Sequence, residues 1–161
     1  MARTAGVSSP LVYNYFSSRQ LLLQELLQRE YDVFSDYITE KTSTLTSFSE
    51  ITRVFIGSNY DFHAPGNILP ILQSQPDIVS AIKEKRSKNS KQTAKYLISI
   101  AAESYKLTKT QAELAITMSS GSSVAAAGYA ASGDFDREEV IDSVLAYVLA
   151  GLEAVSKLPG K

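Results

Sequence analysis

The chain has 161 residues, of which 44% are hydrophobic and 20% charged, and its formal net charge is −1. These values are typical of a globular protein with a hydrophobic core, and they exclude a chain that grips nucleic acid over its whole surface, because phosphate binding needs an excess of cations. The absence of cysteine excludes disulfides and thiolate metal sites, and no apolar run approaches the roughly 18 residues of a membrane-spanning helix. We therefore expect a soluble, cytoplasmic protein without a membrane segment.

The first predicted feature is a glycine turn between two short helical segments. Gly6 follows a short N-terminal segment and has the backbone freedom that a turn after a helix requires. A second short helix then begins, with Ser8 or Ser9 as its N-cap and Pro10 in its first turn. This arrangement is typical of two helices that meet at a steep angle.

A longer helix is predicted over about residues 19–41, preceded by two serines that can cap it, with apolar residues spaced three and four apart. A segment rich in threonine and serine, 42–47, follows it. We take this segment as a boundary between an N-terminal module, 1–41, and a second domain, 48–158.

The second domain also reads as helical, because breakers separate stretches with helical periodicity and no alternating strand pattern appears. We expect Thr108 or Thr110 to cap one of these helices and Asp136 to cap the last. The predicted fold class is therefore all-α, and the predicted helices of this domain cover about residues 51–62, 67–75, 77–105, 110–131 and 137–158.

The run Ala5-Gly6-Val7-Ser8, followed by Tyr13-Asn14-Tyr15-Phe16 and then Leu22, resembles the signature of the TetR (tetracycline-repressor-like) family of transcriptional regulators. In that family an Ala-Gly-Val-Ser turn leads into a helix that ends Tyr-x-x-Phe. The match covers roughly residues 2–27. The resemblance implies a helix-turn-helix DNA-binding module followed by a helical ligand-binding and dimerisation domain. It implies a ligand-responsive repressor that binds palindromic operator DNA as a homodimer and is modulated by a small-molecule effector.

The resemblance also implies which residues meet DNA. Arg19 stands where the family usually has lysine, and either cation can meet a phosphate. The alternative is that the aromatic residues of this run are core residues of a helical hairpin. The positions that correspond to base and phosphate contacts are Ser8, Ser9, Pro10, Leu11, Tyr13, Asn14 and Arg19.

The chain departs from the family pattern before the glycine turn. Family members have one full helix and most of a second there, whereas here only residues 1–5 precede Gly6. We therefore expect the DNA-binding module to be partial and residue 1 not to be the natural start. The alternative function is an effector-binding and dimerisation protein that has lost DNA binding with those helices.

The last two predicted helices form a candidate association surface. The final helix carries a broad apolar stripe, and the helix before it is rich in small residues, including Gly121 and Gly128, which suggest that another helix approaches closely. The resemblance implies that these helices pair with their copies in a four-helix homodimer interface. The alternative is that both are core helices of a monomer.

The middle helices mix aromatic and polar residues, as small-molecule pockets do. We expect a ligand there to move the predicted helix 77–105 and, through it, the helix over 19–41. The alternative is that each of these residues is an ordinary core residue. For His63 the alternative is that it caps its own helix. The candidate ligand-binding residues are Phe55, Asn59, Phe62, His63, Leu72, Tyr96, Met118 and Tyr129.

No motif for catalysis or for a cofactor accompanies these residues. The sequence has no glycine-rich phosphate loop after a strand, no nucleophile elbow and no metal-ligand spacing, and His63 is the only histidine. We therefore expect a protein that is not an enzyme and that needs neither a metal nor a cofactor.

Overall fold

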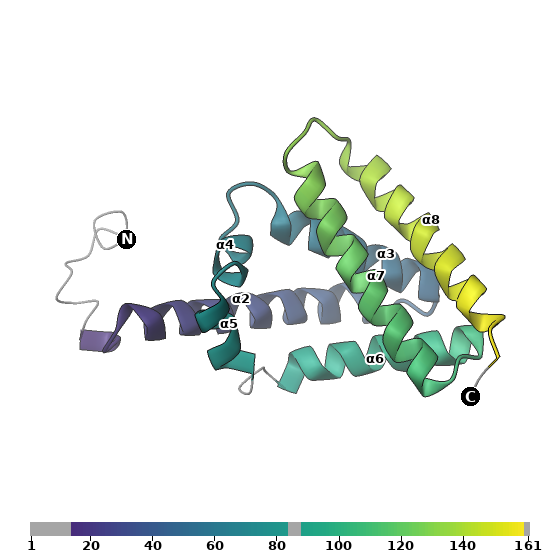
Figure 1. Cartoon of the computed structure of the whole chain (residues 1–161), viewed down its shortest axis with the longest axis horizontal. Coiled ribbons are helices and arrows are strands. Elements are labelled where there is room, and N and C mark those ends of the chain that lie inside the picture. The colour runs from purple at the N-terminus through teal and green to yellow at the C-terminus, as the bar shows by residue number, and fades with distance from the viewer. Residues whose placement is uncertain (1–13, 84–87, 160–161) are drawn as a thin grey trace.

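The computed structural model describes residues 14–83 and 88–159 (Figure 1). Within these ranges the chain forms seven helices and no strand, which confirms the predicted all-α class. The helices are α2 (Arg19–Thr42), α3 (Phe48–His63), α4 (Leu69–Gln73), α5 (Pro76–Lys83), α6 (Lys88–Tyr105), α7 (Lys109–Ala130) and α8 (Arg137–Ser156).

Three helices begin at the residues that the sequence predicts as caps. The Oγ of Ser18 accepts a hydrogen bond from the backbone N–H of Leu21 at 3.1 Å, which satisfies one of the unpaired donors at the start of α2. Thr108, not Thr110, caps α7 and forms a capping box with Gln111. Asp136 caps α8. The predictions from local sequence are confirmed at all three ends.

The predicted helix over 77–105 is wrong, because the structure has two helices, α5 and α6, on either side of residues 84–87. The two run in different directions (Figure 1). Ile78 and Ile82 of α5 are buried against α2, whereas Ala101 of α6 is buried against α3, α7 and α8. The buried residues of the two helices thus belong to different parts of the core.

The core consists of two clusters of buried side chains. The N-terminal cluster joins α2, α4 and α5 and contains Leu23, Leu27, Leu69, Leu72, Ile78 and Ile82. The C-terminal cluster joins α3, α6, α7 and α8 and contains Phe48, Ile56, Ala101, Leu107, Ala112, Ala115, Ile141, Val144, Val148 and Leu152. Because α2 packs against α3, α4, α5 and α6, it shares a core with the second predicted domain. The domain boundary at 42–47 stays a prediction.

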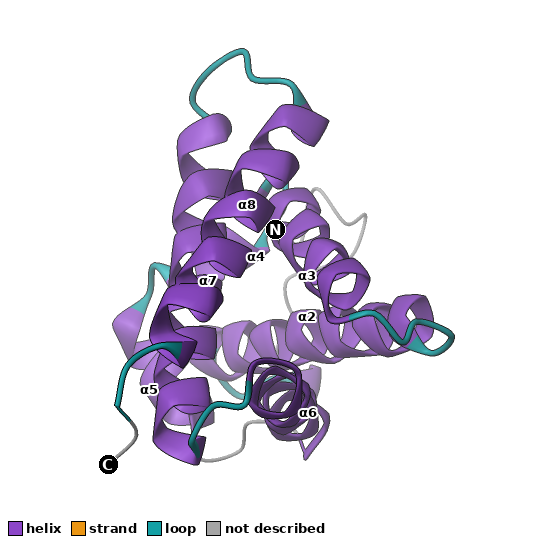
Figure 2. Ribbon diagram, turned by 90° about the vertical axis from the view of Figure 1, so that its right-hand side faces the viewer, coloured by secondary structure: helices purple, strands orange, loops and turns teal. Residues whose placement is uncertain are grey.

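Helices α7 and α8 form an antiparallel pair that covers α3 (Figures 1 and 2). Arg137, at the start of α8, donates through Nε and Nη2 to the carboxylate of Asp61 on α3, at 2.8 and 2.7 Å. Arg53 of α3 likewise reaches Glu138 and Asp142 of α8. These pairs hold the N-terminal half of α8 against α3.

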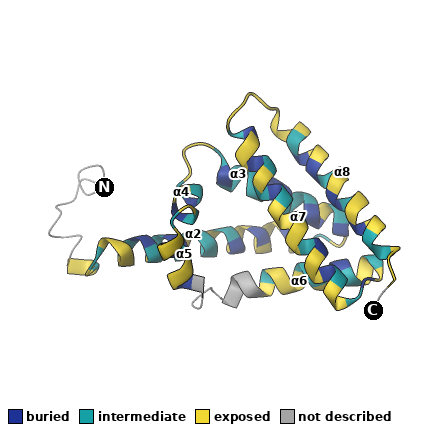
Figure 3. Cartoon of the chain, viewed as in Figure 1, coloured by how far each residue is buried: buried dark blue, intermediate teal, exposed yellow. Residues whose placement is uncertain are grey.

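The first turns of α2 extend beyond the body of the molecule and are largely exposed (Figures 1 and 3). The outward faces of α7 and α8 are exposed as well. No helix within residues 14–83 and 88–159 is both long enough and apolar enough to cross a membrane.

Candidate functional site

A pocket of about 410 Å³ lies where the two core clusters meet, and its volume falls in the range of small-molecule sites, about 300–1,000 Å³. It touches the N-terminal cluster at Leu69 and the C-terminal cluster at Ile56. We call it the central pocket. Its described lining is Tyr31, Phe34 and Ser35 of α2, Phe55, Ile56, Asn59 and His63 of α3, Leu69 and Gln73 of α4, Thr93, Ala94, Leu97 and Ile98 of α6, and Ile116, Thr117, Ser119, Ser120, Ser123 and Val124 of α7.

Several short side chains line the space. Ser35 of α2 and Ser123 of α7 are buried at positions where a core helix would normally carry larger residues, and the exposed residues Ala94 of α6 and Ser120 of α7 line its more open side. Protein interiors are otherwise close-packed, so several short side chains that face one another leave a cavity. Four aromatic and aliphatic side chains, Phe34, Phe55, Leu97 and Ile98, supply apolar walls.

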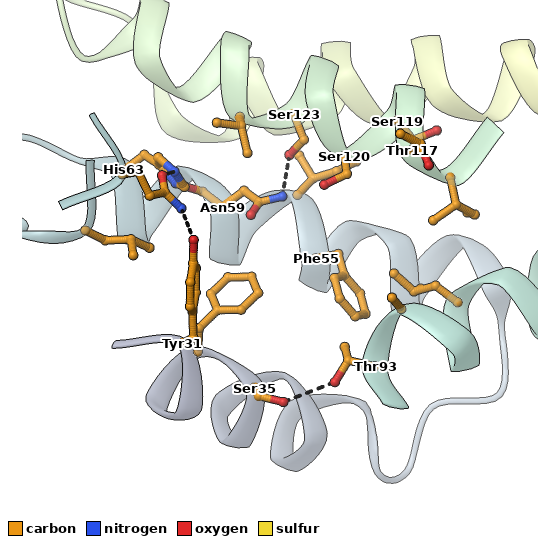
Figure 4. A pocket seen from close by; sticks show the side chains of 18 of the residues that line it. Tyr31, Ser35, Phe55, Asn59, His63, Thr93, Thr117, Ser119, Ser120 and Ser123 are labelled. Carbon is orange, nitrogen blue, oxygen red and sulfur yellow. Dashed lines mark hydrogen bonds between the residues drawn. The ribbon is translucent and has the colours of Figure 1, made fainter. Parts of the chain in front are cut away.

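Hydrogen bonds between side chains link the helices around the central pocket (Figure 4). Asn59 donates through Nδ2 to Ser123 Oγ at 3.0 Å, which links α3 to α7. Gln73 of α4 donates through Nε2 to the hydroxyl of Tyr31 on α2, at 3.4 Å. The hydroxyls of Ser35 and Thr93 are 3.1 Å apart and link α2 to α6. Side chains from five helices therefore meet around one space.

His63 is held by both of its ring nitrogens. Nδ1 lies 2.8 Å from the backbone oxygen of Asn59, and because a carbonyl can only accept, Nδ1 carries a proton. Nε2 lies 3.1 Å from the side-chain oxygen of Gln73. Both nitrogens are thus engaged by amides, and this arrangement contains no Ser–His pair of the kind that activates a nucleophile.

The structure places three of the eight predicted ligand-binding residues, Phe55, Asn59 and His63, in the lining of the central pocket. Phe62 lies next to that space, and its ring packs edge-on against Phe34 with 5.1 Å between ring centroids. Leu72 is a buried residue of the N-terminal cluster. The face of α3 that carries positions 55, 59 and 63 is therefore the one that meets the pocket.

The other three predicted ligand-binding residues point outward. Tyr96, Met118 and Tyr129 are 42%, 60% and 70% exposed. Tyr129 packs against Phe135 in the loop between α7 and α8, with 5.3 Å between ring centroids. On α7 the helical turn places positions 116, 117, 119, 120, 123 and 124 toward the pocket and positions 118 and 129 away from it.

Several lining residues were not predicted from the sequence, and most are polar residues within apolar stripes. Ser35 has this signal, because it lies among apolar neighbours on α2 and is nevertheless buried. Ser123 is likewise a buried polar residue within an apolar stripe, although we interpreted the small residues of its helix as a sign that another helix approaches closely. Tyr31, Gln73 and Thr93 carry no comparable signal, because only the packing of α2, α4 and α6 brings them together.

Most of the predicted DNA-contacting residues, Ser8, Ser9, Pro10, Leu11 and Tyr13, lie outside the described residues. Asn14 and Tyr15 are helical and exposed, as expected for the end of the predicted short helix. Arg19 is exposed and is the first residue of α2. The same helix later contributes Tyr31, Phe34 and Ser35 to the central pocket.

Helices α7 and α8 leave an apolar surface uncovered, which we call the outer face. It carries Leu114, Met118 and Tyr129 of α7 and Tyr147 of α8. Gly121 and Gly128 of α7 and Gly151 of α8 are exposed, and a Cβ added at any of them would meet nothing within 4 Å. No described part of this chain therefore makes the close helix approach that these glycines predict.

A second, smaller hollow of about 280 Å³ lies between α3 and the start of α8, beside Lys41. A hydrogen bond to the carboxylate of Asp61 raises the pKa of the Arg137 guanidinium above its ordinary value, and a hydrogen bond to Asp142 does the same for the pKa of Arg53. Both guanidiniums are paired with carboxylates, and these pairs form a structural ion-pair network between α3 and α8. The described residues also include no group of three His, Cys, Asp or Glu side chains that could hold a metal ion.

Comparison with known proteins adds no relative to this picture: no protein-family model matches the chain, and no curated protein matches it at a significant level. The resemblance to the TetR family therefore rests on the motif residues within the first 27 positions.

Proposed function

We propose that this chain is a ligand-responsive transcriptional regulator of the TetR type, a repressor that binds palindromic operator DNA as a homodimer and responds to a small molecule in the central pocket. The observation that carries the proposal is the position of α2. This helix begins at Arg19, directly after the predicted DNA-reading segment, and lines the central pocket with Tyr31, Phe34 and Ser35.

The coupling follows from the geometry of a helix. Arg19 and Tyr31 are twelve residues apart in one continuous helix, which at 1.5 Å per residue is roughly 18 Å. A ligand that pushes on the pocket wall at Tyr31 therefore also displaces the end of α2 that follows the predicted recognition segment. This route is more direct than the one expected from the sequence, which passed through residues 77–105. The ligand must still bind one position of α2 more tightly than the other for DNA binding to respond.

A homodimer is part of the proposal because two half-sites of a palindrome require two copies of the reading segment. The outer face suits a second copy of the chain. It combines large exposed apolar side chains with glycines that allow helices to approach closely, and its two antiparallel helices would form a four-helix interface with their copies.

The proposal is tested by selecting DNA that this chain binds from a random-sequence library, followed by band-shift titration of the selected sequence. We expect the chain to enrich a palindrome. Asn14→Ala should cost about 1–3 kcal/mol of binding free energy and relax the sequence preference, whereas Thr44→Ala, an exposed change just beyond the other end of α2, should not.

The competing function is an effector-binding and dimerisation protein that does not bind DNA. The charge of the N-terminal part favours it, since residues 1–31 contain three arginines against two glutamates, too few cations for strong phosphate binding. Failure of the chain to enrich any sequence would contradict the proposed regulator and favour this alternative.

A further inference from the structure

The described walls of the central pocket are largely apolar, and their polar groups are uncharged. None of the nineteen described lining residues is Lys, Arg, Asp or Glu. From α2 the only titratable side chain that faces the space is Tyr31, and from α3 it is His63. The described lining residues of α4, α6 and α7 contribute none. Both ring nitrogens of His63 are engaged by Asn59 and Gln73, so this histidine is not oriented to pair with a ligand carboxylate.

A charged ligand would therefore lose part of its hydration without gaining a partner of opposite charge from the described lining. Burying an unpaired charge is far more costly than burying a neutral polar group that keeps a hydrogen bond. The described walls therefore favour uncharged ligands over charged ligands of the same shape.

The polar groups that are present suit neutral hydrogen-bonding partners. Two contacts, Asn59 with Ser123 and Ser35 with Thr93, each include a hydroxyl, which can both donate and accept. A ligand hydroxyl or carbonyl can take the place of one member of such a pair without leaving the other unsatisfied. In Figure 4 the ring of Phe55 lies between these two pairs, so a ligand ring packed on it would have polar side chains on two sides.

We propose that the central pocket takes an uncharged, largely apolar ring compound with at least one hydroxyl or carbonyl group, and that it rejects organic anions and cations of the same size. This inference names the ligand class of the pocket in the proposed function and rests on that pocket being the effector site. Apolar contact with Phe34, Phe55, Leu97 and Ile98 provides the affinity, and the Asn59–Ser123 pair orients the polar group.

The first test compares three probes of one size on the unsubstituted protein: 2-naphthol, 2-naphthoate and 2-naphthylmethylammonium. Calorimetric titration at neutral pH measures each dissociation constant. We expect 2-naphthol to bind at least about tenfold more tightly than either ion. Binding of the carboxylate or the ammonium ion as tight as that of 2-naphthol would overturn the proposal, and so would the absence of any 2-naphthol binding.

The second test places a charge in the pocket with almost no change in shape. Asn59→Asp should weaken 2-naphthol binding and make the ammonium probe bind at least about tenfold more tightly than it binds the unsubstituted protein. Gln20→Glu is the matched control, the same amide-to-acid change on an exposed residue in the first turn of α2, and should leave all three constants unchanged. An unchanged preference in Asn59→Asp would show that the probes bind elsewhere and would overturn the assignment. Circular dichroism checks that both variants keep their helices. If a variant does not fold, the three-probe comparison on the unsubstituted protein still tests the proposal.

These measurements contain no DNA, so they separate this inference from the proposed function. Selective binding of the neutral probe together with a complete lack of DNA binding would leave the inference standing and contradict the proposed regulator. A charged probe that binds the pocket and alters DNA binding would support the proposed regulator and overturn the inference on ligand class.

Discussion

His63 is a single residue whose position the sequence left open between a ligand contact and a helix cap. In the structure it lines the central pocket, donates to the backbone oxygen of Asn59 within its own helix and meets the side chain of Gln73 on α4. It therefore builds one end of the pocket wall and at the same time joins α3 to α4. Its two hydrogen bonds explain why a lone, buried histidine is stable there, since buried polar atoms need partners.

Asp61 allows a residue-scale test of how α8 is held against α3. Asp61→Asn removes the carboxylate that Arg137 grips with two hydrogen bonds. Because the two side chains are 41% and 44% exposed, we expect a loss of only roughly 0.5–1 kcal/mol in the free energy of unfolding at low salt, and a smaller loss at high salt. Urea unfolding at two salt concentrations measures both values.

The control for this test is Asp134→Asn, which makes the same chemical change in the exposed loop before α8 and should have little effect at either salt concentration. A loss at Asp61 that salt leaves unchanged would contradict an electrostatic origin. The raised pKa of Arg137 keeps the guanidinium protonated at every pH at which the protein is folded, so titration of the arginine contributes no pH dependence.

At the scale of elements, the helix ends are the best-predicted features of this protein. Ser18, Thr108 and Asp136 cap α2, α7 and α8 because a short polar side chain next to an apolar repeat satisfies free backbone N–H groups within three residues. This interaction is local, so a sequence pattern is enough to predict it. The break between α5 and α6 was missed because it depends on which cluster each helix packs against.

The start of α7 provides a matched pair of threonines. Thr108→Ala should lower the free energy of unfolding by about 1 kcal/mol, because the backbone N–H of Gln111 then loses its acceptor. Thr110→Ala, two residues further into α7 and exposed, should change it by far less. Thermal unfolding of both variants measures the difference. Equal losses would mean that the side chain of Thr108 does not cap this helix.

At the scale of the whole molecule, the two core clusters and the outer face have different roles. The clusters leave the central pocket between them, and the outer face of α7 and α8 remains apolar and uncovered by this chain. The proposed homodimer would bury that face. A second copy is the occupant that the proposed function requires, because it doubles the reading segment.

Tyr147 is a suitable place to test the dimer, since it is 68% exposed on α8 and its replacement should not disturb the core. Tyr147→Asp should raise the dimer dissociation constant at least about thirtyfold, the effect of losing an aromatic anchor worth about 2 kcal/mol. Sedimentation velocity over a range of concentrations measures this constant. Ile71→Asp, an equally drastic change at an exposed apolar residue of α4, is the control. Dissociation by Ile71→Asp and not by Tyr147→Asp would place the interface elsewhere.

The sequence by itself determined the all-α class, most helix bounds and the three caps, because helical periodicity and capping act over three or four residues. It also named Phe55, Asn59 and His63 among the candidate ligand-binding residues, and these three line the central pocket. Only the tertiary structure decided which of the eight candidates meet that pocket. Periodicity shows which residues share a side of a helix but not which neighbouring helix covers it, so Met118 and Tyr129 turned outward while the serines of the same helix, α7, line the central pocket.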